Sequence, residues 1–148
     1  MNEKAKNYWL DYWNEKGEVA PTNVTAWQFG VDADYLAKLV VDGIKTATCS
    51  GHIFYELEKE PLPKVGDYSI ILNGVNEPEA IIRLTEVTVT PMNQVTEQFA
   101  YDEGEGDRSY AYWWKEHEAF FTKDLKAYGL PFQEDMLVVC ESFELIAK

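Results

Sequence analysis

Apolar side chains recur along the chain at two spacings, and the changes from one spacing to the other predict where helices and strands lie. The first pattern is helical and ends at Gly17, which predicts a helix over residues 3–16. Its face carries four aromatic residues, Tyr8, Trp9, Tyr12 and Trp13. Such a stripe is typical of a helix packed on the body of a domain, so we expect an N-terminal helical extension over residues 1–20.

A short strand and a second helix follow. Residues 24–29 read as a strand, and Asp32 is placed as an N-cap for the next helix. The buried stripe of that helix consists of Leu36, Leu39 and Val40. Gly43 comes at its C-terminal end, where a left-handed backbone costs glycine little. The chain is therefore expected to turn at Gly43 and to become extended over residues 46–50.

The rest of the chain mixes short strands with helices. We expect helical segments over 52–59 and 95–100, strands over 67–73, 80–90 and 136–146, an acidic loop over 101–107, and a long helix that Asp107 caps and Gly129 and Pro131 end. Regular βαβ alternation is absent. The pattern indicates an α+β fold, a small β-barrel flanked by helices, in one domain over residues 1–148.

The net charge of −13, from 13 basic and 26 acidic residues, restricts the partners of the protein. Long nucleic acids are bound largely by Lys and Arg that neutralise phosphates, so a broad basic footprint is not expected. A small positive pocket remains compatible with an acidic chain, because a local field can oppose the global one.

The chain shows no membrane or export signal. No stretch approaches the roughly 18 apolar residues that span a bilayer, and the N-terminus lacks an apolar signal core. We therefore expect a cytoplasmic protein without membrane contact. Cys49 and Cys140 show neither metal-ligand nor redox spacing and are expected to be free thiols. No cofactor is expected.

Lys45 lies among hydroxyl side chains in the segment 43–48, GIKTAT, between a helix and a strand. In the structural interpretation, Lys45 complements the negative end of the helix dipole and the threonines favour a strand. In the catalytic interpretation, Thr48 is a nucleophile whose proton Lys45 accepts. The two residues are three apart, so they converge only if the chain is still turning at Lys45.

A carboxylate from the acidic stretch is the expected partner of Lys45. Glu103 is the first candidate for proton transfer, and Asp102, Glu105 and the strand residue Glu86 are its rivals. The structural alternative is a solvated loop whose charges favour the N-terminus of the next helix. The spacing matches no calcium loop, so a metal site is not expected.

Arg108 and His117 are two further candidates. Arg108 at the start of the last helix suits a carboxylate or phosphate, although it equally suits Asp107 or Glu105. His117 falls on the apolar stripe of the helix, where a buried structural histidine is the usual finding and a ligand contact is the alternative.

The Gly-x-Lys-Thr-x-Thr core of segment 43–48 resembles the signature of ASCH domains, and further blocks extend this similarity over most of the chain. These blocks are the aromatic N-terminal helix, Trp27-Gln28-Phe29-Gly30, residues 103–109, Tyr112-Trp113-Trp114, His117 and residues 135–141. The resemblance is to the longer bacterial branch of the family. It implies the small β-barrel that ASCH domains share with the PUA domain.

A short-chain branch of this family is known as an amidohydrolase that removes the acetyl group from N4-acetylcytidine. By its motif positions, the resemblance implies that Lys45, Thr48 and Glu103 are catalytic, with Glu103 matched through its Ala-x-x-Glu stretch. Trp27, Thr46, Arg108 and His117 are then expected to bind the ligand, Trp27 by stacking on a base. The additional N-terminal helix, the longer last helix and the residues after the motif depart from the short branch and leave the substrate open.

Two hypotheses of function follow. In the first, the protein hydrolyses an amide on a nucleoside-like small molecule: Thr48 attacks the acyl carbon, Lys45 accepts its proton and Glu103 protonates the departing amine. A carboxylate near Lys45 would raise the pKa of the lysine and weaken it as a base, unless burial outweighs this effect. In the second, the same cleft binds a nucleotide or a short RNA without chemistry, since other family members are described as RNA binders and some as nucleases.

Overall fold

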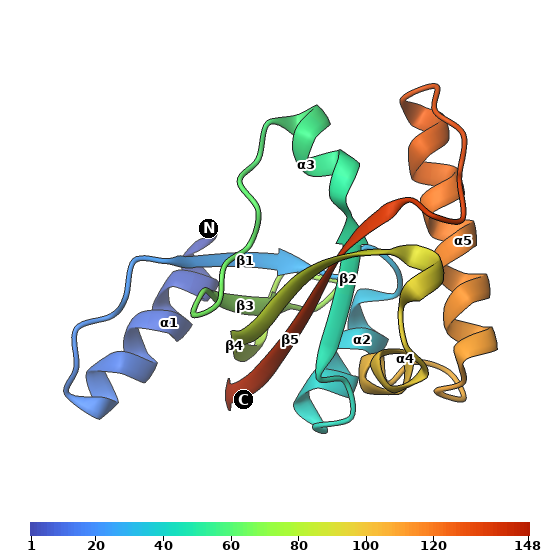
Figure 1. Ribbon diagram of the computed structural model, residues 1–148. Helices are drawn as coiled ribbons and strands as arrows, with labels where there is room; N and C mark the ends of the chain where they lie inside the picture. The colour runs from blue at the N-terminus through green and yellow to red at the C-terminus, as the bar shows by residue number, and fades with distance from the viewer.

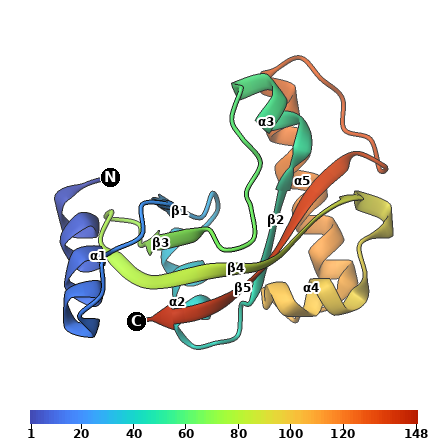
Figure 2. The same ribbon diagram turned by 60° about the vertical axis from the view of Figure 1, so that its left-hand side comes forward.

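Five strands form one curled, half-barrel sheet that runs through the molecule, and helices pack around it (Figures 1 and 2). The computed structural model describes residues 1–148. In chain order the elements are α1 (Glu3–Lys16), β1 (Val24–Gln28), α2 (Ala33–Val41), β2 (Ala47–Gly51), α3 (His52–Glu58), β3 (Tyr68–Leu72), β4 (Pro78–Pro91), the 3-10 turn η1 (Met92–Gln94), α4 (Glu97–Glu103), α5 (Tyr110–Ala127) and β5 (Leu137–Ala147).

The strand order is β1-β3-β4-β5-β2, with β1 parallel to β3 and every other neighbouring pair antiparallel. The two longest strands, β4 and β5, carry register shifts between Ile81 and Ile82 and between Leu84 and Glu86. Irregularities of this kind bend strands and increase their twist. The sheet therefore curls, and its edge strands β1 and β2 come to line one shared cavity.

Strand β3 ends in a continuous apolar run over residues 70–72, and helices cover both faces of the strand there. Ile70 belongs to a buried cluster with Trp9 and Trp13 of α1. Its neighbour Ile71 points the other way, into a cluster with Leu36 of α2. Both isoleucines are fully buried, and each contributes about 1.5–3 kcal/mol of burial free energy. The aromatic stripe of the first helix is thus packed on the sheet, as the sequence predicts.

A third cluster joins α4 and α5 to the end of β5. Its buried members include Trp113 and Phe121 of α5, Ala100 of α4, and Val138 of β5. This packing fixes α4 and α5 against the strand pair β2–β5, next to the segment that contains Lys45.

The turn expected after the second helix is present. Asp32 accepts a hydrogen bond from the Tyr35 amide as the N-cap of α2. Gly43 has a φ of +74°, and nothing lies within 4 Å of the position of a Cβ there, so this glycine is needed for its backbone conformation rather than for space.

Two expectations at the last long helix are wrong. Ser109, not Asp107, caps α5, because the Ser109 hydroxyl accepts a hydrogen bond from the Tyr112 amide. Asp107 instead accepts from the Ser109 amide and shapes the preceding turn. The acidic stretch is also not a loop throughout, since α4 continues to Glu103.

Cys49 and Cys140 are both free thiols, as expected, although they are directly opposite each other on β2 and β5. None of the helices combines the length and the apolar character that crossing a membrane requires.

Candidate functional site

The chain bends at the end of α2 and delivers Lys45 to the interior. The amides of Ile44 and Lys45 both donate to the Leu39 carbonyl, at 2.9 and 3.0 Å, so the turn continues through Lys45. The strand β2 begins only at Ala47. Because Lys45 precedes the strand, the alternation of side chains along β2 does not force Lys45 and Thr48 to opposite faces.

Lys45 is almost completely buried, at 1% exposure, and its ammonium group is held by two carboxylates. It donates to Glu103 Oε1 at 3.2 Å, to the Glu103 backbone carbonyl at 3.3 Å and to Glu105 Oε2 at 2.9 Å. It also lies 5.3 Å from the centre of the Phe29 ring, a cation–π contact. All three N–H donors of the ammonium group therefore have acceptors.

Glu103 is the buried centre of a network that joins α4 to α5. Besides Lys45, its carboxylate accepts a short hydrogen bond from the indole N–H of Trp113. His117 Nε2 lies 3.2 Å from Glu103 Oε2, and His117 Nδ1 donates to the Trp113 carbonyl at 2.7 Å. The imidazole also stacks on the Trp113 ring, with 4.3 Å between ring centres. His117 is thus a network residue on the apolar stripe of α5.

The charges of this network support one another. Burial alone would raise the pKa of the Glu103 carboxyl, but the Lys45 and His117 charges hold that pKa at about 2. Burial alone would lower the pKa of Lys45, but Glu103 and Glu105 raise it above its ordinary value. The pKa of His117 is raised for the same reason: the charge of Glu103 outweighs burial. An anionic Glu103 beside a cationic Lys45 is the resting state of the site.

The tip of α4 is fixed to the Lys45 segment by backbone contacts. The Thr46 amide donates to the Asp102 carbonyl at 2.8 Å. The Arg108 guanidinium lies over the Tyr101 ring at 3.6 Å and donates to the Tyr101 carbonyl. Thr46 and Arg108 thus hold the network together from outside, and neither lines one of the cavities described below.

The structure also distinguishes among the four carboxylates that the sequence offers as partners of Lys45. Glu86 is exposed on β4, and the Asp102 side chain accepts from Gln98 on the surface of α4. Glu103 and Glu105 are the two carboxylates that reach Lys45.

A small cavity of about 100 Å³ opens beside the buried network. Its walls include Lys45, Thr48, Glu103, Glu105 and His117. Sequence reasoning named all five of these residues, and the structure brings them to one space.

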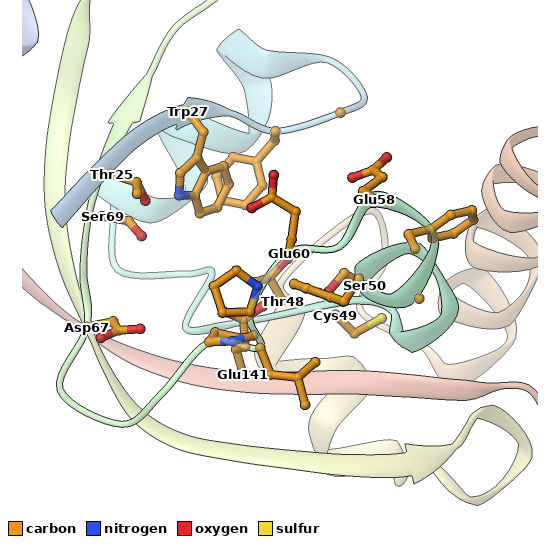
Figure 3. A pocket seen from close by; sticks show the side chains of 18 of the residues that line it. Thr25, Trp27, Thr48, Cys49, Ser50, Glu58, Glu60, Asp67, Ser69 and Glu141 are labelled. Atoms are coloured by element: carbon orange, nitrogen blue, oxygen red, sulfur yellow. The ribbon is translucent and has the colours of Figure 1, made fainter. Parts of the chain in front are cut away.

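A second, much larger cavity of about 930 Å³ lies inside the half-barrel, between β1, β3 and β2 (Figure 3). Eight of its lining residues are aromatic, Trp27 among them, and none is Lys, Arg or His. Its five carboxyl side chains are Glu58, Glu60, Asp67, Asp124 and Glu141. The large cavity is therefore aromatic and acidic.

Thr48 belongs to both cavities. It shares this position with Phe29, Gly30, Cys49 and Phe120, which also line both, so the two spaces adjoin along the start of β2. A ligand in the large cavity would meet the Lys45–Glu103 network at Thr48. Trp27 lies in the large cavity only, edge-on to Phe29 with 4.8 Å between ring centres.

Sequence reasoning missed Glu141 as a site residue. It lies on β5 directly opposite Thr48, and it lines the large cavity. Burial, with smaller contributions from the charges of Glu103 and Asp67, raises the pKa of its carboxyl to about 7. The available signal is an acidic residue directly after the apolar run of residues 137–140 in the last strand.

Cys49, Glu103 and His117 offer donor atoms within 4.8 Å of one another, a set of types that can bind a divalent metal. The Glu103 carboxylate is already engaged by Lys45, Trp113 and His117. A cation there would compete with the Lys45 ammonium for the same oxygens, so the donors do not form a free metal site.

The chain is similar to known proteins over its whole length. The family model of the ASCH domain matches residues 25–147. The structure of an ASCH domain from Lactobacillus crispatus JV V101 is 34% identical, with a TM-score of 0.91 over 100% of this chain and 97% of that chain. A protein from Enterococcus faecalis V583 is 41% identical, with a TM-score of 0.88 over 99% of this chain and 90% of that chain.

More distant similarity is confined to the fold. ASCH from Zymomonas mobilis is 12% identical, with a TM-score of 0.51 over 82% of this chain and 65% of that chain. A search of curated proteins gives no significant match.

Proposed function

Because this chain belongs to the ASCH domain family, we propose that it hydrolyses the amide of an acylated, unphosphorylated nucleoside such as N4-acetylcytidine. One observation carries the proposal: Thr48 lies where a large aromatic cavity meets the buried Lys45–Glu103 network. The large cavity would bind the nucleoside, and Thr48 would meet the acyl carbon.

The walls of the large cavity suit a nucleobase. Trp27 offers an aromatic ring for stacking, and the carboxylates offer acceptors for the hydroxyls and N–H groups of a nucleoside. The volume of about 930 Å³ is within the range of small-molecule sites.

The carbonyl oxygen of the substrate gains negative charge when its carbon is attacked, and Lys45 is the nearby cation that would stabilise it. Of the two carboxylates that hold Lys45, Glu105 is the more exposed, at 22% against 2% for the Glu103 side chain. The substrate oxygen would therefore displace Glu105, while Glu103 keeps the ammonium in place. This role differs from the expectation that Lys45 accepts a proton, because its carboxylate neighbours keep it charged.

The competing hypothesis is a binding module for nucleotides or short RNA. Phosphate recognition relies on Arg, Lys and backbone N–H groups, and no basic side chain lines the large cavity. The net charge of −13 adds long-range repulsion for polyanions. We therefore favour the enzyme.

The test is acetate release from N4-acetylcytidine by the purified protein. Thr48→Ala is expected to lower kcat on the order of 10³-fold or more, as loss of a nucleophile does. Thr88→Ala is the matched control, since Thr88 is an exposed strand threonine outside both cavities. Absence of turnover together with salt-sensitive binding of short RNA would support the binding module instead.

A further inference from the structure

Thr48 and Glu141 are partners across the antiparallel pair of β2 and β5. Side chains directly opposite each other in such a pair lie on the same face, with their Cβ atoms roughly 4.5–5.5 Å apart. Both residues line the large cavity, and Figure 3 shows them close together on one side of it. A hydroxyl and a carboxyl are thus presented side by side to whatever occupies the cavity.

Thr48 needs a base in order to act as a nucleophile, because a threonine hydroxyl is unreactive until a neighbour accepts its proton. Lys45 cannot serve, since all three of its N–H groups have acceptors and two carboxylates keep it charged. His117 is occupied as well, because its two ring nitrogens contact the Trp113 carbonyl and Glu103.

Glu141 is suited to proton transfer by its position. It lies in the middle of β5, paired on one side with β2 and on the other with β4, so its backbone is rigidly held. The groups that act on its charge are carboxylates, Glu103 from α4 and Asp67, the residue before β3. Tyr55 of α3 and the neighbouring thiol of Cys140 are the other titratable groups that sense Glu141.

We propose that Glu141 is the proton-transfer residue of this site: its carboxylate accepts the Thr48 hydroxyl proton during attack and then passes that proton to the departing amine. This inference rests on the proposed function, because it assigns a second catalytic residue to the same reaction. Glu103 accordingly holds Lys45 in place and is a positioning residue.

The steps balance. As the Thr48 Oγ–C bond forms, the hydroxyl proton moves to Glu141 and the electron pair of the C=O bond moves to the carbonyl oxygen beside Lys45. When that pair returns, the C–N bond breaks and the nitrogen takes the proton from Glu141, which leaves an acyl ester on Thr48. Water then attacks the ester, with Glu141 again accepting and returning one proton, and the acid and free Thr48 are released.

The carboxyl must be ionised to begin this cycle, and its pKa is raised to about 7 by burial first and then by Glu103 and Asp67. We therefore expect the rate of the first step to rise with pH up to about 7 and then to level off. A pKa close to working pH is what a group needs in order to accept and return the same proton.

The experiment measures p-nitrophenolate release from p-nitrophenyl acetate together with acetate release from N4-acetylcytidine. The variants are Glu141→Gln, Thr48→Ala and Glu144→Gln, the last an exposed residue of β5 paired with Arg83 outside both cavities. The activated ester reports attack by Thr48 even if the nucleoside is not the substrate. Mass spectrometry of the protein locates the acetyl group.

We expect Thr48-dependent ester cleavage to fall about 10²-fold or more in Glu141→Gln and to lose its rise towards pH 7, with Glu144→Gln like the wild type. Thr48-dependent cleavage that is unchanged in Glu141→Gln would overturn the assignment of Glu141 and leave the proposed function standing. Ester cleavage that requires both residues, without turnover of N4-acetylcytidine, would support Glu141 and contradict the proposed substrate. Ester cleavage that is independent of Thr48 would overturn both.

Discussion

The Lys45 ammonium lies 3.2 Å from Glu103 Oε1 in the interior, where the two side chains are 1% and 2% exposed. Charges are rarely buried to this extent unless they are paired, since the loss of hydration is costly. The pair is supplemented by His117 and Trp113 on α5 and by Glu105, so the network ties three segments of the chain together.

Removal of the lysine charge is expected to destabilise the fold. Lys45→Met would leave the Glu103 carboxylate buried without its main partner, which costs about 3–5 kcal/mol in comparable cases. Lys38→Met is the control, because the Lys38–Asp42 pair on the surface is worth at most about 1 kcal/mol. The measurement is the free energy of unfolding in urea. Equal stability of the two variants would show that the buried pair is not needed for the fold.

His117 is expected to titrate above its ordinary value. Burial would lower its pKa, but the charge of Glu103 outweighs that effect and raises it. The stabilisation that follows is complete below about pH 6.5 and is lost as the pH rises through the pKa of the folded state. NMR of the imidazole measures this pKa directly. The Glu103→Gln variant should titrate lower, because the largest contribution that raises the pKa is then lost and only the Trp113 carbonyl and the charge of Glu105 still oppose burial. An unchanged pKa would remove Glu103 as the cause.

Glu141 is expected to cost the protein stability. Its folded pKa of about 7 lies above its ordinary value, so ionisation opposes folding as the pH rises from about 4.5 to 7. At pH 8 the free energy of unfolding in urea should therefore be larger for Glu141→Gln than for the wild type, by up to about 3 kcal/mol, and at pH 4.5 the two should be similar. A gain in stability with a loss of activity is typical of a functional residue. Destabilisation at pH 8 would mean that the carboxylate supports the fold.

Phosphate on the ligand is expected to weaken binding. The large cavity contains five carboxyl side chains and no basic one, so a 5′-phosphate meets repulsion wherever it lies in that space. Cytidine 5′-monophosphate should bind at least about tenfold more weakly than cytidine by calorimetry, and the difference should shrink in high salt. Tighter binding of the monophosphate would favour the nucleotide-binding hypothesis.

The sequence predicts the helices and strands well, since each has its own local signal. Asp32 and Gly43, for example, mark the ends of α2 through capping and a left-handed turn. It also points to the components of the buried network, because Lys45 lies among hydroxyl residues and His117 on an apolar stripe. Glu103 lies among other acidic residues, and only the family motif favours it over them. The pattern predicts Asp107 as the cap of α5, and this is wrong because Ser109, two residues on, is equally suited to the role and takes it.

The large cavity could not be predicted in the same way. Its walls come from all five strands and from α3 and α5, which meet because the register shifts in β4 and β5 curl the sheet. The pairing of Thr48 with Glu141 likewise depends on strand register, and a shift by one residue would turn Glu141 to the other face. For Thr46 and Arg108 the motif suggests ligand contacts. In the structure both residues donate hydrogen bonds to backbone carbonyls of α4.

The most direct test of the site is a crystal structure of the Thr48→Ala variant with N4-acetylcytidine. We expect the base to lie against Trp27 in the large cavity, with the acetyl carbon about 3–3.5 Å from the position that the Thr48 hydroxyl occupies in the wild type and the acetyl oxygen towards Lys45. A nucleoside bound with its acetyl group pointing away from residue 48, or outside the large cavity, would contradict the proposed reaction.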